Sequence, residues 1–159
     1  MSTTIIKNIG RVLSADINQP VLNATCILIK DGIIEAVDGD SIAAGVTADQ
    51  TIDAKGATVM PGLMDSHVHT TIGDYGHRLS ISGFIAAAMQ GGVTTMISAG
   101  ECHMPGRPRD AEGAKAMAVL AHKSFDKLRP AGVKVHGGAL ILEKGLVEKD
   151  FEYLAGQGV

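Results

Sequence analysis

The chain has 159 residues, of which 45% are hydrophobic and only 3% are aromatic, and its formal net charge is −3. This length predicts one domain, or one domain and part of another, and the apolar fraction suffices for an aliphatic core. The sequence has no basic patch and no apolar run near the ~20 residues that span a bilayer, which argues against nucleic acid and membranes as partners.

The two cysteines, Cys26 and Cys102, lie in dissimilar contexts, and the N-terminal residues lack the apolar core of a signal peptide. Two isolated thiols do not make a disulfide framework and are typical of a reducing compartment. We therefore expect a cytoplasmic protein.

Residues 1–58 read as a small β-sandwich module built from short strands. The pair Asp31-Gly32 separates two apolar runs, 24–30 and 33–37, and such a pair is a strong hairpin signal. Further strands are predicted over 3–6, 51–53 and 57–60. Several short strands are marginal alone, so we expect this module to bury one face against another layer.

From residue 59 the pattern changes to strands alternating with helices. Apolar residues recur at helical spacing from Ile81 to Ala88, Gly91-Gly92 marks the end of that helix, and Asp110 is a predicted N-cap of the next one. The elements predicted here are helices over 81–90, 110–128 and 147–154 and strands over 93–99 and 133–137.

A Gly-Val pair, called the Gly-Val echo below, follows each predicted helix: Gly92-Val93, Gly132-Val133 and Gly158-Val159. The first two pairs open strands, and by analogy the third opens another. Strands alternating with helices indicate a parallel sheet with right-handed crossovers. Since a (β/α)8 barrel typically needs about 250 residues, residues 59–159 are expected to form the first three units of an incomplete TIM-like barrel, ending before strand four.

The stretch 59–69 carries the most specific chemical signal and reads VMPGLMDSHVH. Side chains alternate along a strand, so Asp65, His67 and His69 are predicted to share one face. Two imidazoles at i and i+2 can hold one metal ion, and neutral imidazole is a common ligand of zinc and iron. Asp65 is either a further ligand or, as we favour, a group that orients a histidine through a hydrogen bond.

This stretch, preceded by IDAKGAT, resembles the N-terminal part of the metal-dependent amidohydrolase superfamily, whose members combine a small β-sandwich with a (β/α)8 barrel. The segments KNIGRVLSADINQPVL, GGVTTMISAG, HMPGRPRDAEG and RPAGVKVHGGALILEKGL resemble the enamidase branch of that superfamily. Enamidases hydrolyse the cyclic amide 6-oxo-1,4,5,6-tetrahydronicotinate in bacterial nicotinate degradation. Relatives similar to dihydroorotase or imidazolonepropionase share the general pattern and are an alternative.

The resemblance implies that His67 and His69 are the first two ligands of a divalent metal centre, zinc with a second zinc or iron ion. The family's bridging carboxylate, its later histidines and its proton-transferring Asp belong to strands four to eight, and this sequence contains no residue that corresponds to them. No catalytic proton-transfer group is therefore assigned within the chain. The resemblance also implies a cyclic amide substrate and a homotetramer.

Three further residues are candidate substrate-binding groups, because barrels of this kind place their active sites at the carboxyl ends of the strands. His103 follows the second barrel strand and His136 ends the third, and either is a candidate to bind the substrate carboxylate or carbonyl. Arg107 is a candidate carboxylate clamp, since its planar fork suits bidentate contacts. A surface or structural role is the alternative for each of the three.

Other chemically suggestive residues carry weaker hypotheses. Lys134 is a poor candidate for a carboxylated bridging lysine, because it lies on the third strand and faces away from Val133 and Val135. Cys102 has no evident partner as a nucleophile. His77 and His122 read as loop and helix-surface residues.

Two functional readings remain open besides the hydrolase. The chain is alternatively a non-catalytic or split-subunit polypeptide that acts only by association, or a metal-binding module without hydrolysis. The isolated chain is expected to be inactive, to bind divalent metal weakly and to self-associate through open strand edges.

Overall fold

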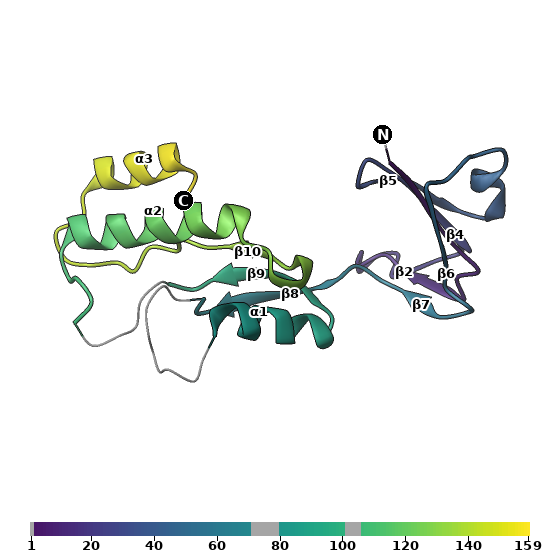
Figure 1. The fold of residues 1–159 in the computed structure, drawn as a ribbon. Coiled ribbons are helices and arrows are strands. Elements are labelled where there is room, and N and C mark those ends of the chain that lie inside the picture. Colours follow the sequence, from purple (N-terminus) through teal and green to yellow (C-terminus); the bar gives the residue numbers. More distant parts are fainter. Residues whose placement is uncertain (1, 71–79, 101–105) are drawn as a thin grey trace. The chain divides into compact units, whose positions relative to one another are not determined.

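The computed structural model describes residues 2–70, 80–100 and 106–159. The chain divides into two compact units, Met1–Pro61 and Gly62–Val159 (Figure 1). The change of pattern that we predicted after residue 58 falls within the last short strand of the first unit.

The first unit contains two small sheets. The larger sheet has the strand order β5-β4-β1-β6 and the smaller has the order β3-β2-β7. Their strands are β1 (Thr3–Lys7), β2 (Arg11–Leu13), β3 (Val21–Leu22), β4 (Cys26–Lys30), β5 (Ile33–Asp38), β6 (Gln50–Asp53) and β7 (Thr58–Val59). The sequence did not predict β2 and β3, because strands of two or three residues are too short to show a period.

β4 is an inner strand of the larger sheet, and its two faces pack into different cores. Ile27 lies in one cluster with Val12, whereas Cys26 and Leu28 lie in a second cluster with Ile5. The second cluster is also covered by the 3-10 turn η1 (Asp40–Ala43). β4 and β5 pair antiparallel through the predicted hairpin. The apolar run 24–30, which we predicted to be a strand, therefore supplies buried residues to both faces of the sheet.

The second unit contains a three-stranded parallel sheet with the order β10-β9-β8, and helices alternate with its strands along the chain. The strands are β8 (Leu63–Val68), β9 (Val93–Ser98) and β10 (Lys134–His136), and the helices are α1 (Ile81–Gln90), α2 (Ala111–Lys127), the short 3-10 element η2 (Pro130–Gly132) and α3 (Glu148–Gln157). The alternation of strand and helix agrees with the prediction. In the described part of the chain the sheet is open and no barrel is closed.

The core of this unit lies between the sheet and the helices. It joins one face of all three strands to the apolar stripes of α1 and α2, and it consists of Val68, Ile85, Met96, Ala121, Phe125, Val133 and Val135. The alanine stripe of α2 allows a close approach to the sheet, with Ala118 and Ala121 fully buried. In β10 the exposed Lys134 and His136 alternate with the buried Val135.

The Gly-Val echo has a common structural basis. Gly92, Gly132 and Gly158 all have φ near +85°, namely +87°, +82° and +87°. This left-handed conformation ends or reverses a helical turn at little cost only in glycine. The echo therefore marks three equivalent exits from helical structure.

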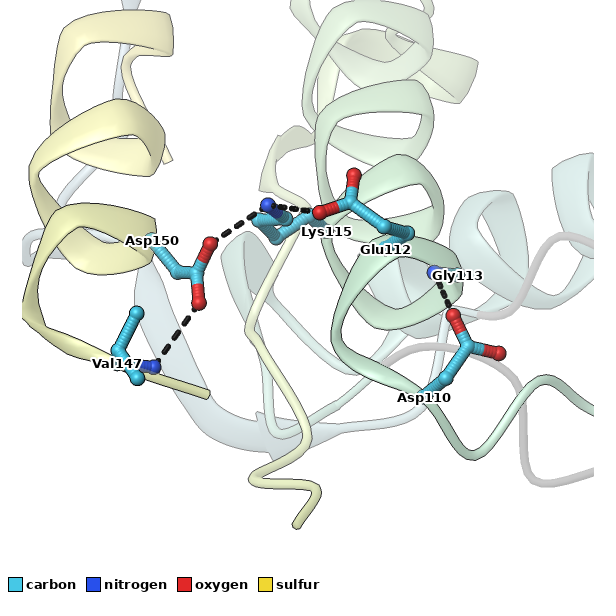
Figure 2. A network of polar contacts seen from close by, with 6 residues as sticks. All are labelled: Asp110, Glu112, Gly113, Lys115, Val147 and Asp150. Carbon is cyan, nitrogen blue, oxygen red and sulfur yellow. Dashed lines mark hydrogen bonds and ion pairs between the residues drawn. The ribbon is translucent and has the colours of Figure 1, made fainter. Parts of the chain in front are cut away.

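Polar contacts fix the starts of the helices and join α2 to α3, which lie side by side (Figure 1). Asp110 Oδ1 accepts a hydrogen bond of 2.8 Å from the Gly113 N–H, as the predicted N-cap requires. Figure 2 shows Lys115 of α2 donating both to Glu112 and to Asp150 of α3, at 2.7 and 2.6 Å. The other oxygen of Asp150 accepts from the Val147 N–H at 2.9 Å and so caps α3.

These contacts act on the protonation of both partners. The hydrogen bond from Lys115, with a further one from the Val147 N–H, lowers the pKa of Asp150. The hydrogen bonds to Asp150 and Glu112 raise the pKa of Lys115. Both Asp150 and Lys115 are therefore held in their ionised forms.

None of the helices in the described ranges has the length and apolar character needed to cross a bilayer.

Candidate metal centre

The candidate centre lies at the carboxyl end of β8, where His67 and His69 flank the buried Val68. Val68 is 5% exposed and packs in the helix-side core, whereas both histidines are exposed. His67 is the last residue before Val68 in the strand, and His69 follows directly after the last strand residue. The two ring centroids lie 5.3 Å apart with the planes at 88°.

This ring spacing can be tested against the geometry of a shared ion. A Zn–N distance of about 2.1 Å, with about 1.1 Å more to the ring centre, places each centroid about 3.2 Å from the ion, and a tetrahedral angle then separates the centroids by about 5.2 Å. The observed 5.3 Å agrees with this value. The centroid spacing of the two imidazoles is therefore the spacing that two ligands of one zinc-type ion would have.

His69 is anchored by the neighbouring strand. Its Nδ1 lies 3.1 Å from the carbonyl oxygen of Gly100. Just before it, the Val68 carbonyl accepts a 2.7 Å hydrogen bond from the Ala99 N–H. The sequence analysis did not identify Gly100, because its contact with His69 joins residues 31 positions apart.

Asp65 occupies an irregular part of the β8–β9 ladder. Asp65 pairs with Met96 and Val68 pairs with Ser98, so β8 has one residue more than β9 over this interval, and an opposite irregularity lies between Leu63 and Met64. The strict alternation on which we placed Asp65 beside the histidines does not hold through this stretch. Asp65 Oδ1 accepts a 3.1 Å hydrogen bond from the His67 N–H, and an orienting role for it stays a prediction.

His136 ends β10, at the same carboxyl end of the parallel sheet as the histidine pair. It is exposed, pairs with Ile97 of β9 and follows Val135, which is buried on the helix side. Alternation places His136 on the face of β10 opposite to the buried Val135. Lys134 is exposed on that face as well, opposite to Val133 and Val135 as predicted.

The other candidate groups are differently situated. Arg107 forms an ion pair with Glu143, and the side chains are only 16% and 13% exposed, so its guanidinium already has an acidic partner. A role for Arg107 as a carboxylate clamp stays a prediction. His103, together with Cys102 and His77, lies outside the described residues.

His122 is not simply a helix-surface residue. It is half-buried on α2, and a Cβ on Gly158 would lie 2.9 Å from its Nε2. It also borders a hollow of about 510 Å³ that includes His136, Leu142, Phe151 and Val159. Across residues 2–70, 80–100 and 106–159, no group of three or more His, Cys, Asp or Glu side chains is placed to hold a metal ion. The candidate ligands among the described residues are therefore His67 and His69 alone.

Comparison with known proteins gives the class of this chain. No family model matches it. It is 55% identical to enamidase from Eubacterium barkeri over 159 residues, which is all of this chain and 41% of that enzyme. L-hydantoinase from Paenarthrobacter aurescens is 40% identical over 101 residues, 61% of this chain and 20% of that protein. Dihydroorotase from Bacillus cereus is 32% identical over 133 residues, 82% of this chain and 28% of that protein.

Structural comparison agrees with these relationships. The crystal structure of enamidase, described as a member of the amidohydrolase superfamily, matches 99% of this chain with a TM-score of 0.90 and 55% identity. The structure of L-hydantoinase from Arthrobacter aurescens matches 83% of this chain and 25% of that protein, with a TM-score of 0.54 and 31% identity.

The chain therefore belongs to the amidohydrolase superfamily. Within that superfamily it is similar to enamidase over its whole length, and it corresponds to the N-terminal part of that enzyme. It spans 41% of the length of enamidase and less of the other relatives. The resemblance that the motifs predicted is confirmed.

Proposed function

We propose that this chain provides the first two metal ligands of an enzyme that hydrolyses a cyclic amide in the manner of enamidase. The observation that carries the proposal is the histidine pair at the end of β8, whose rings are spaced for one ion in a chain 55% identical to enamidase. The metal would be zinc with a second zinc or iron ion, and the substrate a compound such as 6-oxo-1,4,5,6-tetrahydronicotinate.

The roles of the chain's own residues follow from their placement. His67 and His69 would hold the ion, and the Gly100 carbonyl holds the ring of His69. When bound, such an ion lowers the pKa of a water molecule to about 7 and polarises an amide carbonyl. His136 and His103 are the candidates to bind the substrate, with Arg107 as a candidate for its carboxylate. Catalytic zinc sites normally have three protein ligands, so at least one more ligand must come from outside the described residues.

A chimera tests this function. The chain is joined at Val159 to the part of Eubacterium barkeri enamidase that follows the matched segment, and hydrolysis of 6-oxo-1,4,5,6-tetrahydronicotinate is measured by loss of substrate. We expect turnover, and we expect His67→Ala and His69→Ala to abolish it together with bound metal. His122→Ala is the matched control, because His122 lies on α2 and is not one of the proposed ligands.

The outcome separates the possible substrates. Hydantoin and dihydroorotate are offered to the same chimera, and preference for either would replace the enamidase-like assignment with one of the alternative relatives. A folded chimera that keeps full turnover without His67 and His69 would refute the metal-ligand role.

A second candidate function is association without catalysis, and the exposed apolar surface of the second unit favours it. Met64 on β8 is 61% exposed and Leu142 beside the 510 Å³ hollow is 74% exposed. These two exposed side chains are the candidates for an interaction site, since large exposed apolar patches usually mark such sites. In this reading the 159-residue chain works with another polypeptide and, without one, binds its own copies.

Light scattering of the purified chain tests the association. Leu142→Asp is expected to weaken self-association, and Leu120→Asp on α2, which is 53% exposed, is the control for an added charge. A monodisperse monomer at high concentration would count against this second function.

A further inference from the structure

The segment between β10 and the end of α3 leaves α2 and returns to it at one residue, His122. An added Cβ on Gly138 would lie 2.8 Å from the Cβ of His122, and an added Cβ on Gly158 would lie 2.9 Å from its Nε2. Segment 139–157, which these two glycines flank, is called the strap below. Its two ends are therefore held against opposite ends of one side chain.

Between its ends the strap is fastened near the start of α2 by two ion pairs. Glu143 pairs with Arg107, which precedes α2, and their side chains are 13% and 16% exposed. Asp150 accepts a 2.6 Å hydrogen bond from Lys115, and both of these side chains are 13% exposed (Figure 2). Removing one partner of such a pair leaves a charge with little access to water, which costs more than breaking a surface pair.

Apolar burial contributes little to the docking of the strap. No residue of 139–147 is buried, and the buried residue of α3 is Leu154. One buried leucine supplies only a small part of the free energy that is needed to order a segment of this length. Segments with few buried apolar contacts open locally at a lower free energy than the core. The two ion pairs are therefore expected to decide whether the strap stays closed.

Backbone contacts join the two ion pairs to each other. The Leu146 N–H donates to the Glu143 carbonyl at 3.4 Å, and the next N–H, of Val147, donates to the Asp150 carboxylate at 2.9 Å. The stretch from Glu143 to Asp150 thus has its own hydrogen bonds across the turn that separates the two acidic residues. Release of one pair should therefore loosen the other.

We propose that the strap opens and closes on α2 as one unit, with Arg107–Glu143 and Lys115–Asp150 as its latch. Leu142 and Phe151 belong to the strap and line the hollow of about 510 Å³ beside His122. The state of the latch therefore also determines whether this hollow is present. This inference depends neither on a bound metal ion nor on hydrolysis.

Hydrogen exchange of the 159-residue chain, followed by mass spectrometry, tests the strap. Glu143→Gln removes a charge that lies outside α3 and keeps the size of the side chain. The amides of α3 should then exchange about tenfold to a hundredfold faster, which corresponds to the loss of one hydrogen bond to a charged group. Asp150→Asn should have the same effect, although its side-chain oxygen can still accept from the Val147 N–H. The amides of α1 should keep their native rates.

Controls separate the latch from general stability. Glu152→Gln removes an exposed carboxylate of α3 outside the latch and should leave the exchange rates of α3 unchanged. If a latch variant does not fold, the native chain at low urea concentrations replaces it. The amides of α3 should then exchange through one common opening, at a lower free energy than the amides of α1.

Three results would overturn the proposal. If Glu143→Gln leaves the exchange of α3 at its native rate, the two ion pairs act independently and the strap is not one unit. If a latch variant accelerates α1 and α3 equally, the ion pairs stabilise the whole unit instead of a strap. If α3 and α1 of the native chain open at the same free energy in urea, the strap does not open separately.

Discussion

The loop that leaves β10 packs directly on α2, and Gly138→Ala measures how tightly. Gly138 has φ of +97°, and an added Cβ would lie 2.6 Å from the Ala118 carbonyl oxygen and 2.8 Å from the Cβ of His122. Left-handed strain costs about 1–2 kcal/mol. Overlap with helix backbone adds about 1–3 kcal/mol, since neither atom is the end of a flexible side chain. The free energy of unfolding should therefore fall by about 2–5 kcal/mol.

A matched glycine separates the two contributions. Gly145 has a similar φ of +99°, and nothing lies within 4 Å of its added Cβ. Gly145→Ala should therefore cost only the strain of about 1–2 kcal/mol. Both variants are compared by urea denaturation followed by circular dichroism. Equal losses for Gly138→Ala and Gly145→Ala would refute the close contact with α2, and with it the anchoring of the loop that follows His136.

Three further predictions concern the same unit. The Lys115–Asp150 contact should stabilise the second unit at neutral pH. This contribution should be lost as pH falls below about 4 through the lowered pKa of Asp150, and as pH rises past about 10.4 through the raised pKa of Lys115. In a series of thermal melts at different pH values, Asp150→Asn should therefore reduce the loss of stability at acid pH. Ile85→Ala, at a site with 0% exposure, should cost about 2–5 kcal/mol in denaturant unfolding, and a loss below 1 kcal/mol would mean that α1 is loosely packed. Thr70 is 1% exposed, and its hydroxyl has no hydrogen-bond partner among the described residues, so Thr70→Val should raise stability by about 1 kcal/mol, whereas a fall would reveal a bound partner.

Local signals in the sequence predicted much of the fold. The Asp31-Gly32 turn, the Asp110 cap and the apolar period of α1 each depend on residues within one or two turns of the chain, and the structure contains all three elements. The parallel order of β8, β9 and β10 followed from the alternation of strands and helices. Such local patterns predict a secondary-structure element without knowledge of the residues that pack against it.

The candidate site was only partly predictable. The sequence predicted that His67 and His69 lie together because they are two residues apart at the end of one strand, and their ring centroids are 5.3 Å apart. It did not reveal the irregular pairing at Asp65 or the contact of Gly100 with His69, since both depend on the register between β8 and β9. The Arg107–Glu143 ion pair likewise joins segments distant in the sequence, so the pairing of these two charges could not be predicted from the sequence around either residue.

The anchoring of His69 from β9 has a consequence for protein engineering. A designer who transplants the H-x-H tripeptide into a foreign strand moves two imidazoles but leaves behind the carbonyl that orients the second one. The smallest portable unit is the paired end of two strands, residues 67–69 with residues 98–100, including a glycine with φ of +133°. Grafts that carry both strand ends should keep the second imidazole in its orientation, and grafts of the tripeptide alone should lose the contact that sets it.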